Sequence, residues 1–355
     1  MERLSESRSN LVRKYKHIVI PKFGGKESLL LAEDELLEPQ ANEVRVKVLA
    51  AGVSFADILM REGVHPESWN LARTPFTPGW DVVGVVDKLG DNVSTWQTGQ
   101  TVAALPIVGG YSEYILMSSD ELVPVPPRLD HAEAVSLVLN YTTAYQMLHR
   151  CAHIKSGETI LINGGAAGGV GTALLQLGKL ANLKKMYGTA SGEKHDIVSS
   201  LGGIPIDYKA VDLVQEIIKL TNHNGDGRES GVDAVFDGIG GKSFKSSYEI
   251  LRSGGGRLVA YGGTPTSDLQ EWMKMFTMNL VSDKRKFILY SIQTLKRLKP
   301  DWFHADLTLL LNLLKEGKIK PIVAARMPLN QVAQAHELLV SGSVKAGKIV
   351  LICNV

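Results

Sequence analysis

The sequence predicts an α/β protein in which a small, mostly antiparallel β-domain precedes a doubly wound parallel sheet flanked by helices. Three observations lead to this prediction. Short apolar strands separated by turns fill the chain up to about residue 127, and strands and helices alternate regularly after about residue 130. A glycine-rich loop also joins a strand to a helix at 158–171. The 355 residues are enough for two domains with well-buried cores.

The first region contains several short strands that suit an antiparallel sheet. Its segment EVRVKV alternates strictly between apolar and charged residues, which is typical of a strand with one buried face. Three closely spaced prolines end the region, because proline cannot donate to a sheet ladder. The expected strands are 17–20, 43–48, 79–86, 100–104 and a further one that begins within 109–115.

The second region opens with a helix over 132–150 and then alternates between strand and helix, as a doubly wound parallel sheet does. The expected strands are 159–162, 185–190, 204–207, 232–237 and 257–261, and the expected helices are 193–201, 213–220 and 243–251.

The last part of the chain returns to β character. A long helix at 303–316 precedes a strand at 322–324, a helix at 332–339 and a final strand at 348–352. We expect this part to fold back onto the first domain and to make that domain discontinuous. The predicted domains are therefore 15–137 with 288–355, and 138–287, after a flexible N-terminal extension at 1–14.

Composition narrows the classes of function. The net charge of +2 provides no field that would attract nucleic acid or an anionic membrane. No apolar stretch approaches the ~20 residues that span a bilayer. The first 14 residues lack the apolar core of a signal peptide. Cys151 and Cys353 form no CxxC motif, which favours a reducing, cytoplasmic setting.

The stretch ETILINGGAAGGVG at 158–171 is the strongest functional signal. An apolar strand enters a loop with a GxxGxxG spacing at Gly165, Gly168 and Gly171, and a helix follows. Such loops hold a dinucleotide pyrophosphate through backbone N–H groups and the positive end of the helix. We expect Ala167, Gly169 and Val170 to contribute to this contact with the three glycines. The alternative is a glycine-rich turn that binds nothing.

Several blocks in this order resemble the medium-chain dehydrogenase/reductase superfamily. They are 52–57, 78–84, 140–145, the glycine loop, and 188–191 with Lys194 and His195. The chain is most similar to the zinc-independent, zeta-crystallin-like quinone oxidoreductase branch and, within it, to the vesicle amine transport protein homologues. The resemblance covers about 15–355. It implies a GroES-like β-domain plus a Rossmann domain, with NADPH and substrate in the cleft between them.

The resemblance also implies a site without metal. Zinc-containing alcohol dehydrogenases of this superfamily use a Cys, a His–Glu pair and a later Cys or Asp. This chain carries Ser54 in place of the first Cys and Trp80–Asp81 in place of the pair. Zinc sites need thiolate or imidazole ligands at set positions. Without a Lewis acid, we expect reduction of conjugated substrates instead of alcohol oxidation.

The end of the second parallel strand favours NADPH over NADH. NAD sites usually carry an acid there, whereas this chain has Ser191 followed by Lys194, which suits a 2′-phosphate. Resemblance adds Tyr208 to the phosphate site and Thr143 to the nicotinamide region. Glu193 argues against this assignment, and Lys194 could instead be a solvated residue in a first helical turn. Two more expected cofactor contacts lie at carboxyl ends of strands, namely Asp237 and Gly262.

The candidate catalytic residues are Ser54, Asp57 and Tyr141, with Asn140 as a further hydrogen-bond donor. Ser54 and Asp57 are three residues apart, so one helical turn would place them on the same side. Asp57 could instead cap a helix or pair with Arg61, and Tyr141 could be a core tyrosine.

We therefore expect an NADPH-dependent oxidoreductase that transfers hydride to a quinone or to an α,β-unsaturated carbonyl compound, an enone or alkenal. One alternative is a trans-enoyl reductase of a polyketide or fatty-acyl pathway. Another is an NADPH-binding scaffold protein with low turnover. From kinship we also expect a homodimer in which the strand at 257–261 continues across the subunits.

Overall fold

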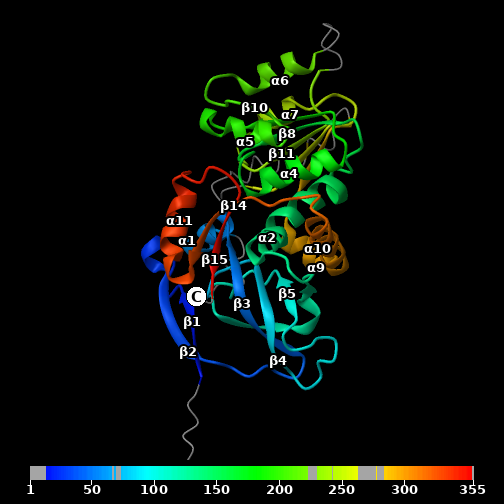
Figure 1. Ribbon diagram of the computed structural model, residues 1–355. Coiled ribbons are helices and arrows are strands. Elements are labelled where there is room, and N and C mark those ends of the chain that lie inside the picture. Colours follow the sequence, from blue (N-terminus) through cyan, green and yellow to red (C-terminus); the bar gives the residue numbers. More distant parts are fainter. Residues whose placement is uncertain are drawn as a thin grey trace, which may run out of the picture.

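The computed structural model describes residues 13–65, 68, 73–222, 230–241, 243–262, 277 and 284–353. Two sheets organise this part of the chain: a largely antiparallel sheet in the lower half of Figure 1 and a parallel sheet in the upper half. The predicted combination of a β-domain and a doubly wound parallel sheet is confirmed. Most of the expected N-terminal extension, residues 1–12, lies outside the described residues.

The lower sheet has seven strands in the order β14-β15-β3-β4-β5-β7, with β6 also paired to β3. Strand β3 pairs antiparallel with β15, so the two ends of the chain meet in one sheet, as the return of β character predicts. Alternate valines of β3 are buried, which explains the strict alternation in the sequence. The strands are β3 (Glu43–Val53), β4 (Val82–Leu89), β5 (Thr101–Ala104), β6 (Tyr114–Ser118), β7 (Val123–Pro124), β14 (Val323–Pro328) and β15 (Lys348–Ile352).

The upper sheet has six parallel strands in the order β10-β9-β8-β11-β12-β13. Its last strand was not predicted, because a run of four residues shows too little periodicity to be recognised. Strand β13 covers β12, so the expectation that 257–261 forms the free edge of the sheet is wrong. The expected boundary after residue 287 falls inside β13. The strands are β8 (Thr159–Asn163), β9 (Lys185–Thr189), β10 (Ile204–Ile206), β11 (Ala234–Asp237), β12 (Arg257–Ala260) and β13 (Lys286–Leu289).

The helix expected at 132–150 is continuous in space but irregular. Two π-helical stretches interrupt it, and such widened turns are frequent at functional sites. None of the described helices is long and apolar enough to cross a lipid bilayer. The segments of this irregular helix are α2 (His131–Ser136), η4 (Leu137–Tyr141), α3 (Thr142–Tyr145) and η5 (Gln146–Cys151).

The remaining helices pack around the two sheets (Figure 1). The short helix that follows β3 provides the helical turn on which Ser54 and Asp57 were expected to face the same side, with Ser54 as its N-cap and Asp57 in its first turn. The helices are α1 (Phe55–Glu62), α4 (Gly169–Leu180), α5 (His195–Ser200), α6 (Leu213–Thr221), α7 (Ser243–Glu249), α9 (Ile292–Leu298), α10 (Pro300–Lys315) and α11 (Val332–Val340). Short 3₁₀ turns are η1 (Lys26–Ser28), η3 (Ser119–Glu121), η6 (Gly192–Lys194) and η7 (Leu329–Gln331).

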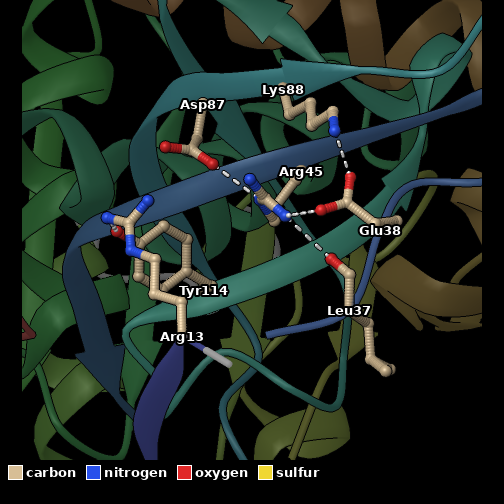
Figure 2. Close-up of polar contacts among 7 residues, drawn as sticks. All are labelled: Arg13, Leu37, Glu38, Arg45, Asp87, Lys88 and Tyr114. Carbon is tan, nitrogen blue, oxygen red and sulfur yellow. Dashed lines mark hydrogen bonds and ion pairs between the residues drawn. The ribbon is translucent and has the colours of Figure 1, made fainter. Parts of the chain in front are cut away.

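A hairpin of β1 (Lys14–Val19) and β2 (Leu30–Glu35) precedes the lower sheet and begins one residue before the expected domain start. Figure 2 shows the polar contacts at its base. The Arg13 guanidinium donates to the Tyr114 hydroxyl at 2.6 Å. Buried Arg45 donates to Asp87 at 2.6 Å and to a backbone carbonyl at 3.0 Å. Because these charges are paired, we interpret the cluster as structural: it connects β3 to β4 and to the segment that follows β2.

Candidate active site

The glycine-rich loop leads from β8 into α4 and leaves the start of the helix open. Gly164 and Gly165 have φ angles of 90° and 70°, which residues with a side chain rarely adopt. A Cβ on Gly171 would lie 2.2 Å from the Gly165 carbonyl oxygen, so only glycine allows the loop to pack on the helix. No side chain caps α4, which begins at Gly169. Its first N–H groups and its positive end can therefore receive a phosphate.

The predicted loop contacts divide into exposed and buried positions. Gly165 is exposed, and Gly168, Gly169 and Val170 are half-buried, so these four can reach a ligand. Ala167 and Gly171 are buried.

The buried Ala167 connects the glycine-rich loop to the segment before β15. Its carbonyl accepts a hydrogen bond from the Gly347 N–H at 3.0 Å, and Gly168 forms an isolated β-bridge with the same residue. The glycine-rich loop of the upper sheet is thereby hydrogen-bonded to the segment that enters β15 in the lower sheet.

The residue after Gly347 forms a buried ion pair. Lys348 Nζ lies 2.7 Å from Asp81 Oδ2, and both side chains are buried. Burial raises the pKa of Asp81, and the Lys348 ammonium opposes that rise. A Cβ on Gly52 would lie 2.0 Å from Lys348 Cε, so the glycine in β3 makes room for the lysine.

Ser54 and Asp57 lie together at the start of α1, as predicted. The Ser54 hydroxyl and the Ser54 N–H donate to Asp57 Oδ2 at 2.6 and 2.8 Å. The two residues form a capping box, so the helix-capping role that the sequence left open is real. Asp57 does not pair with Arg61, whose guanidinium donates to the Gly24 carbonyl and to Glu62.

Asp57 differs from an ordinary capping residue because it is fully buried. Burial raises the pKa of Asp57 to about 6, the hydrogen bonds from Ser54 oppose the rise, and the nearby Asp81 carboxylate adds to it. Ser54 itself is half-buried. Asp57 can therefore bind or release a proton near neutral pH, and the partly exposed Ser54 hydroxyl is hydrogen-bonded to it.

Within the described residues, no hydrogen bond joins Tyr141 or Asn140 to this pair. Tyr141 is buried in η4, and its hydroxyl has no hydrogen-bond partner among the described residues. Asn140 lies against the cofactor loop instead, because a Cβ on Gly169 would approach its Nδ2 to 1.9 Å.

Thr143 is buried in α3, next to a hydrogen-bonded network that links both sheets. The Tyr290 hydroxyl, just after β13, donates to Gln146 Oε1 at 2.8 Å. The Gln146 amide donates in turn to Asp306 Oδ2 in α10 at 3.1 Å. This network fixes the irregular helix that would face the nicotinamide.

Ser191 and Lys194, which the sequence predicts at a 2′-phosphate, follow β9, and Tyr208 follows β10. Ser191 donates to Glu193 at 3.4 Å, and Lys194 Nζ donates to the Gly342 carbonyl at 2.9 Å. Tyr208 is exposed. Ser191 and Lys194 therefore already have hydrogen-bond partners within the protein.

The Asp237 side chain has a structural task that sequence reasoning did not foresee. Its Oδ1 accepts hydrogen bonds from the N–H groups of Ile239 and Gly240, both at 2.9 Å. Its Oδ2 accepts from the Ser247 hydroxyl at 2.6 Å. The carboxylate thus shapes the loop after β11. Gly262 lies beside that loop, where a Cβ would approach the Gly238 oxygen to 2.0 Å.

Sequence reasoning assigned Tyr111 only to the wall of the pocket and missed two buried polar residues, His336 and Lys348. A charged residue that opens an apolar strand was a usable signal for Lys348. His336 occupies an apolar-face position of its helix, between Val332 and Leu339, which was a weaker signal.

Comparison with known proteins decides the family. The alcohol dehydrogenase GroES-like domain matches residues 40–127, and the zinc-binding dehydrogenase domain matches residues 203–351. The quinone oxidoreductase of Mus musculus is 30% identical over 333 residues, which cover 93% of this chain and 95% of that protein. The chain belongs to the quinone oxidoreductase branch of the medium-chain dehydrogenase/reductase superfamily. The predicted resemblance is confirmed, and the protein is an oxidoreductase of this type.

Two further relatives extend the comparison. The synaptic vesicle membrane protein VAT-1 homolog of Danio rerio is 30% identical over 352 residues, covering 95% of this chain and 70% of that protein. The crystal structure of Escherichia coli quinone oxidoreductase complexed with NADPH has 26% identity and a TM-score of 0.83. It covers 95% of this chain and 99% of the other.

The name of the second matching domain raises the question of zinc, and the residues present do not suit that ion. Asp81 is paired with Lys348, the Ser54 hydroxyl is bonded to Asp57, and Trp80 offers no ligand atom. Zinc sites in proteins use thiolates, imidazoles and free carboxylates. Within the described part of the chain, no three His, Cys, Asp or Glu side chains cluster as metal ligands would.

Proposed function

We propose that this oxidoreductase is an NADPH-dependent reductase of quinones or of α,β-unsaturated ketones and aldehydes, and that it works without a metal ion. The Ser54–Asp57 pair is the observation that carries the proposal. A half-buried hydroxyl lies 2.6 Å from a buried carboxyl whose pKa is raised to about 6. This arrangement suits proton delivery to a substrate oxygen near neutral pH.

The cofactor assignment follows from the open loop and from the relative that was crystallised with NADPH. Backbone groups of Gly165 and of 168–170 would hold the pyrophosphate, and Thr143 would border the nicotinamide. Ser191, Lys194 and Tyr208 would hold the 2′-phosphate. When bound, NADPH supplies the hydride. Asp237 and Gly262 would support the adjoining loops.

Ser54 and Asp57 would move the proton that the reduced substrate needs. When Asp57 is protonated, its carboxyl group donates to Ser54 Oγ, and the serine hydroxyl becomes free to donate to the substrate oxygen. As negative charge develops on that oxygen, the serine proton moves to the substrate. Ser54 then recovers a proton from Asp57. The Ser54 N–H, which donates to Asp57 Oδ2 at 2.8 Å, stabilises the carboxylate until water returns the proton.

The absence of suitable zinc ligands limits the substrates that fit this proposal. A simple ketone would place its developing charge on one oxygen, which a single serine hydroxyl stabilises poorly. Conjugation spreads that charge over several atoms. Quinones, enones and alkenals therefore match the chemistry that these side chains can perform.

We also propose that the protein is cytoplasmic and forms a homodimer. Strand β13 lies at the edge of the parallel sheet and leaves Leu289 half exposed. Edge strands with unpaired backbone groups are templates for pairing with another chain.

An acceptor screen with the chelator-treated protein tests the proposed function. We expect steady NADPH oxidation with phenanthrenequinone or with a trans-2-alkenal, and much slower oxidation of NADH. Tight NADPH binding with no turnover on any quinone, enone or alkenal would refute the enzyme assignment and favour a scaffold protein. Activity that appears only after zinc is added would refute the metal-free site.

A further inference from the structure

Three buried side chains, Arg61, His336 and Tyr111, are joined in series by polar contacts. Arg61 lies four residues after Asp57 on the same face of α1. His336 lies in α11, which packs beside α1 (Figure 1). Tyr111 comes from the segment before β6. The proposed reaction does not yet use any of the three, although all are buried.

The contact between Arg61 and His336 determines where the histidine carries its proton. Arg61 Nη1 lies 3.3 Å from His336 Nδ1. A guanidinium group can only donate, so Nδ1 must accept, and the ring proton is on Nε2. Burial lowers the pKa of His336 to about 3, and the Arg61 charge lowers it further, so the ring is neutral.

The direction of hydrogen bonding continues through Tyr111. His336 Nε2 lies 3.5 Å from the Tyr111 hydroxyl, a long hydrogen bond in which the nitrogen donates. The tyrosine proton is then left to donate elsewhere. Asp57 Oδ1 is buried and has no hydrogen-bond partner within the described part of the chain. Burial, and then the Asp57 and Asp81 carboxylates, hold the pKa of Tyr111 well above its usual value, so the hydroxyl keeps a proton that it can donate.

We propose that Arg61, His336 and Tyr111 form a positioning chain in which each group donates to the next and Tyr111 donates to Oδ1 of Asp57. The chain keeps the other carboxylate oxygen directed at Ser54. It also favours the ionised form of Asp57, so the carboxyl group releases its proton to Ser54 more readily. The effect on activity rests on the proposed function, whereas the tautomer of His336 does not.

Other charged groups near Asp57 are fixed by partners of their own. Asp81 is paired with Lys348, and the buried thiol of Cys353, just after β15, donates to the Leu351 carbonyl at 3.9 Å and has a pKa raised by burial. The Tyr111 hydroxyl is neutral, so Tyr111→Phe removes the proposed donor to Asp57 without changing the charge around that carboxylate.

Nitrogen-15 NMR of the full-length protein tests the chain independently of turnover. With histidine labelled at both ring nitrogens, and with His336→Gln used for assignment, we expect a proton on Nε2 and a bare Nδ1 at neutral pH. A proton on Nδ1, or a doubly protonated ring, would overturn the proposal even if the protein reduces no substrate.

Tyr111→Phe tests the consequence for catalysis. Activity that needs protonated Asp57 declines as the pH rises through the pKa of that group. Loss of a donor to the carboxylate should raise that pKa by about one unit, a tenfold gain in proton affinity. The declining limb of kcat/KM should therefore move to higher pH. Tyr248→Phe, which removes another buried tyrosine hydroxyl from α7, should leave the limb in place.

A purely structural role for Tyr111 predicts a different result. It would lower the plateau of kcat/KM or the thermal stability of Tyr111→Phe while the limb stays at its wild-type pH, and that outcome would overturn the chain. His336→Gln retains a donor near the position of Nε2 and should behave like wild type. His336→Leu lacks the donor and should shift the limb as Tyr111→Phe does. If no variant of the protein turns over any acceptor, the proposed function fails, and the NMR result alone decides the chain.

Discussion

Lys348 Nζ and Asp81 Oδ2 lie 2.7 Å apart, with only 1% and 0% of the two side chains exposed. This ion pair joins β15 to the residue that precedes β4. The neighbouring Gly347 binds the cofactor loop through Ala167, so one short segment contacts both the cofactor loop and the buried ion pair. Loss of one charge of this buried pair would therefore destabilise the segment that connects the two sheets.

Lys348→Met should lower the free energy of unfolding by about 3–5 kcal/mol, because it leaves the Asp81 carboxylate buried without a partner. The pKa of Asp81 is already raised by burial. Protonation can relieve the mutant at low pH, so the loss should be greater at about pH 8 than at about pH 5. Urea unfolding at both pH values measures this difference.

The double variant Asp81→Asn/Lys348→Met is the control for that prediction. It removes both charges and should recover most of the stability lost in Lys348→Met. A single-variant loss below about 1 kcal/mol at high pH would mean that water reaches the pair.

Gly168→Asp should abolish cofactor binding, because a carboxylate at the start of α4 would repel the pyrophosphate and occupy its N–H groups. Gly168→Ala is the matched control. Gly168 has a φ of −73°, and a Cβ there would come within 3.1 Å of only one loop oxygen. Fluorescence titration with NADPH should show weak or no binding for the aspartate and near-normal binding for the alanine. Equal affinity in the two variants would exclude the loop as the phosphate site.

Lys194→Ala should weaken NADPH binding by about 1–2 kcal/mol, as expected when a charged hydrogen bond is lost, and should leave NADH binding almost unchanged. The Gly342 carbonyl, which Lys194 contacts at 2.9 Å, can be solvated without the lysine. Lys179→Ala serves as the control, because it removes an exposed lysine in the last turn of α4, at the end away from the glycine-rich loop. The same loss for both cofactors would show that Lys194 does not recognise the 2′-phosphate.

Asp57→Asn should remove the pH dependence that the proposed mechanism assigns to this group. The pKa of Asp57 is raised from 3.8 to about 6, so the active, protonated form dominates below about pH 6 and declines above it. The asparagine variant cannot donate an acidic proton, and its kcat/KM should be lower by about 100-fold without a limb near pH 6. A pH–rate profile from about pH 5 to pH 9 measures both effects.

Stability should respond to the same substitution with a definite sign. The folded protein binds the Asp57 proton more tightly than the unfolded chain, so this group's contribution to stability is lost as the pH rises from 3.8 toward 6. Asp57→Asn should thus be more stable relative to wild type at about pH 8 than at about pH 4. A constant difference at the two pH values would contradict the raised pKa.

Local patterns in the sequence predicted most of the fold. The alternation of strands and helices after residue 130 and the glycine loop are short-range signals, and the structure contains both. The short strand β13 was missed, and the helix predicted at 132–150 is present but is irregular in a way that the sequence did not indicate. Strand β13 has four residues, and the π-helical turns of η4 and η5 leave no distinct pattern of hydrophobicity.

The candidate site was harder to predict because its decisive contacts join distant parts of the chain. Tyr111 and His336 are 225 positions apart, and only the folded structure brings them together. Spacing alone could pair Ser54 with Asp57, since one helical turn connects them. Position at the end of a strand predicted a cofactor contact for Asp237, but no sequence pattern could show that its carboxylate also accepts hydrogen bonds from the adjoining loop and from Ser247.

Transfer of deuterium from NADPH labelled at C4 tests the central claim most directly. In a single turnover in ordinary water, with both C4 hydrogens of NADPH replaced by deuterium, a trans-2-alkenal and chelator-treated protein, we expect one deuterium on the β-carbon of the product. Transfer should need no added metal. Product without deuterium at the β-carbon, or transfer that occurs only when zinc is restored, would contradict a metal-independent reduction by this protein.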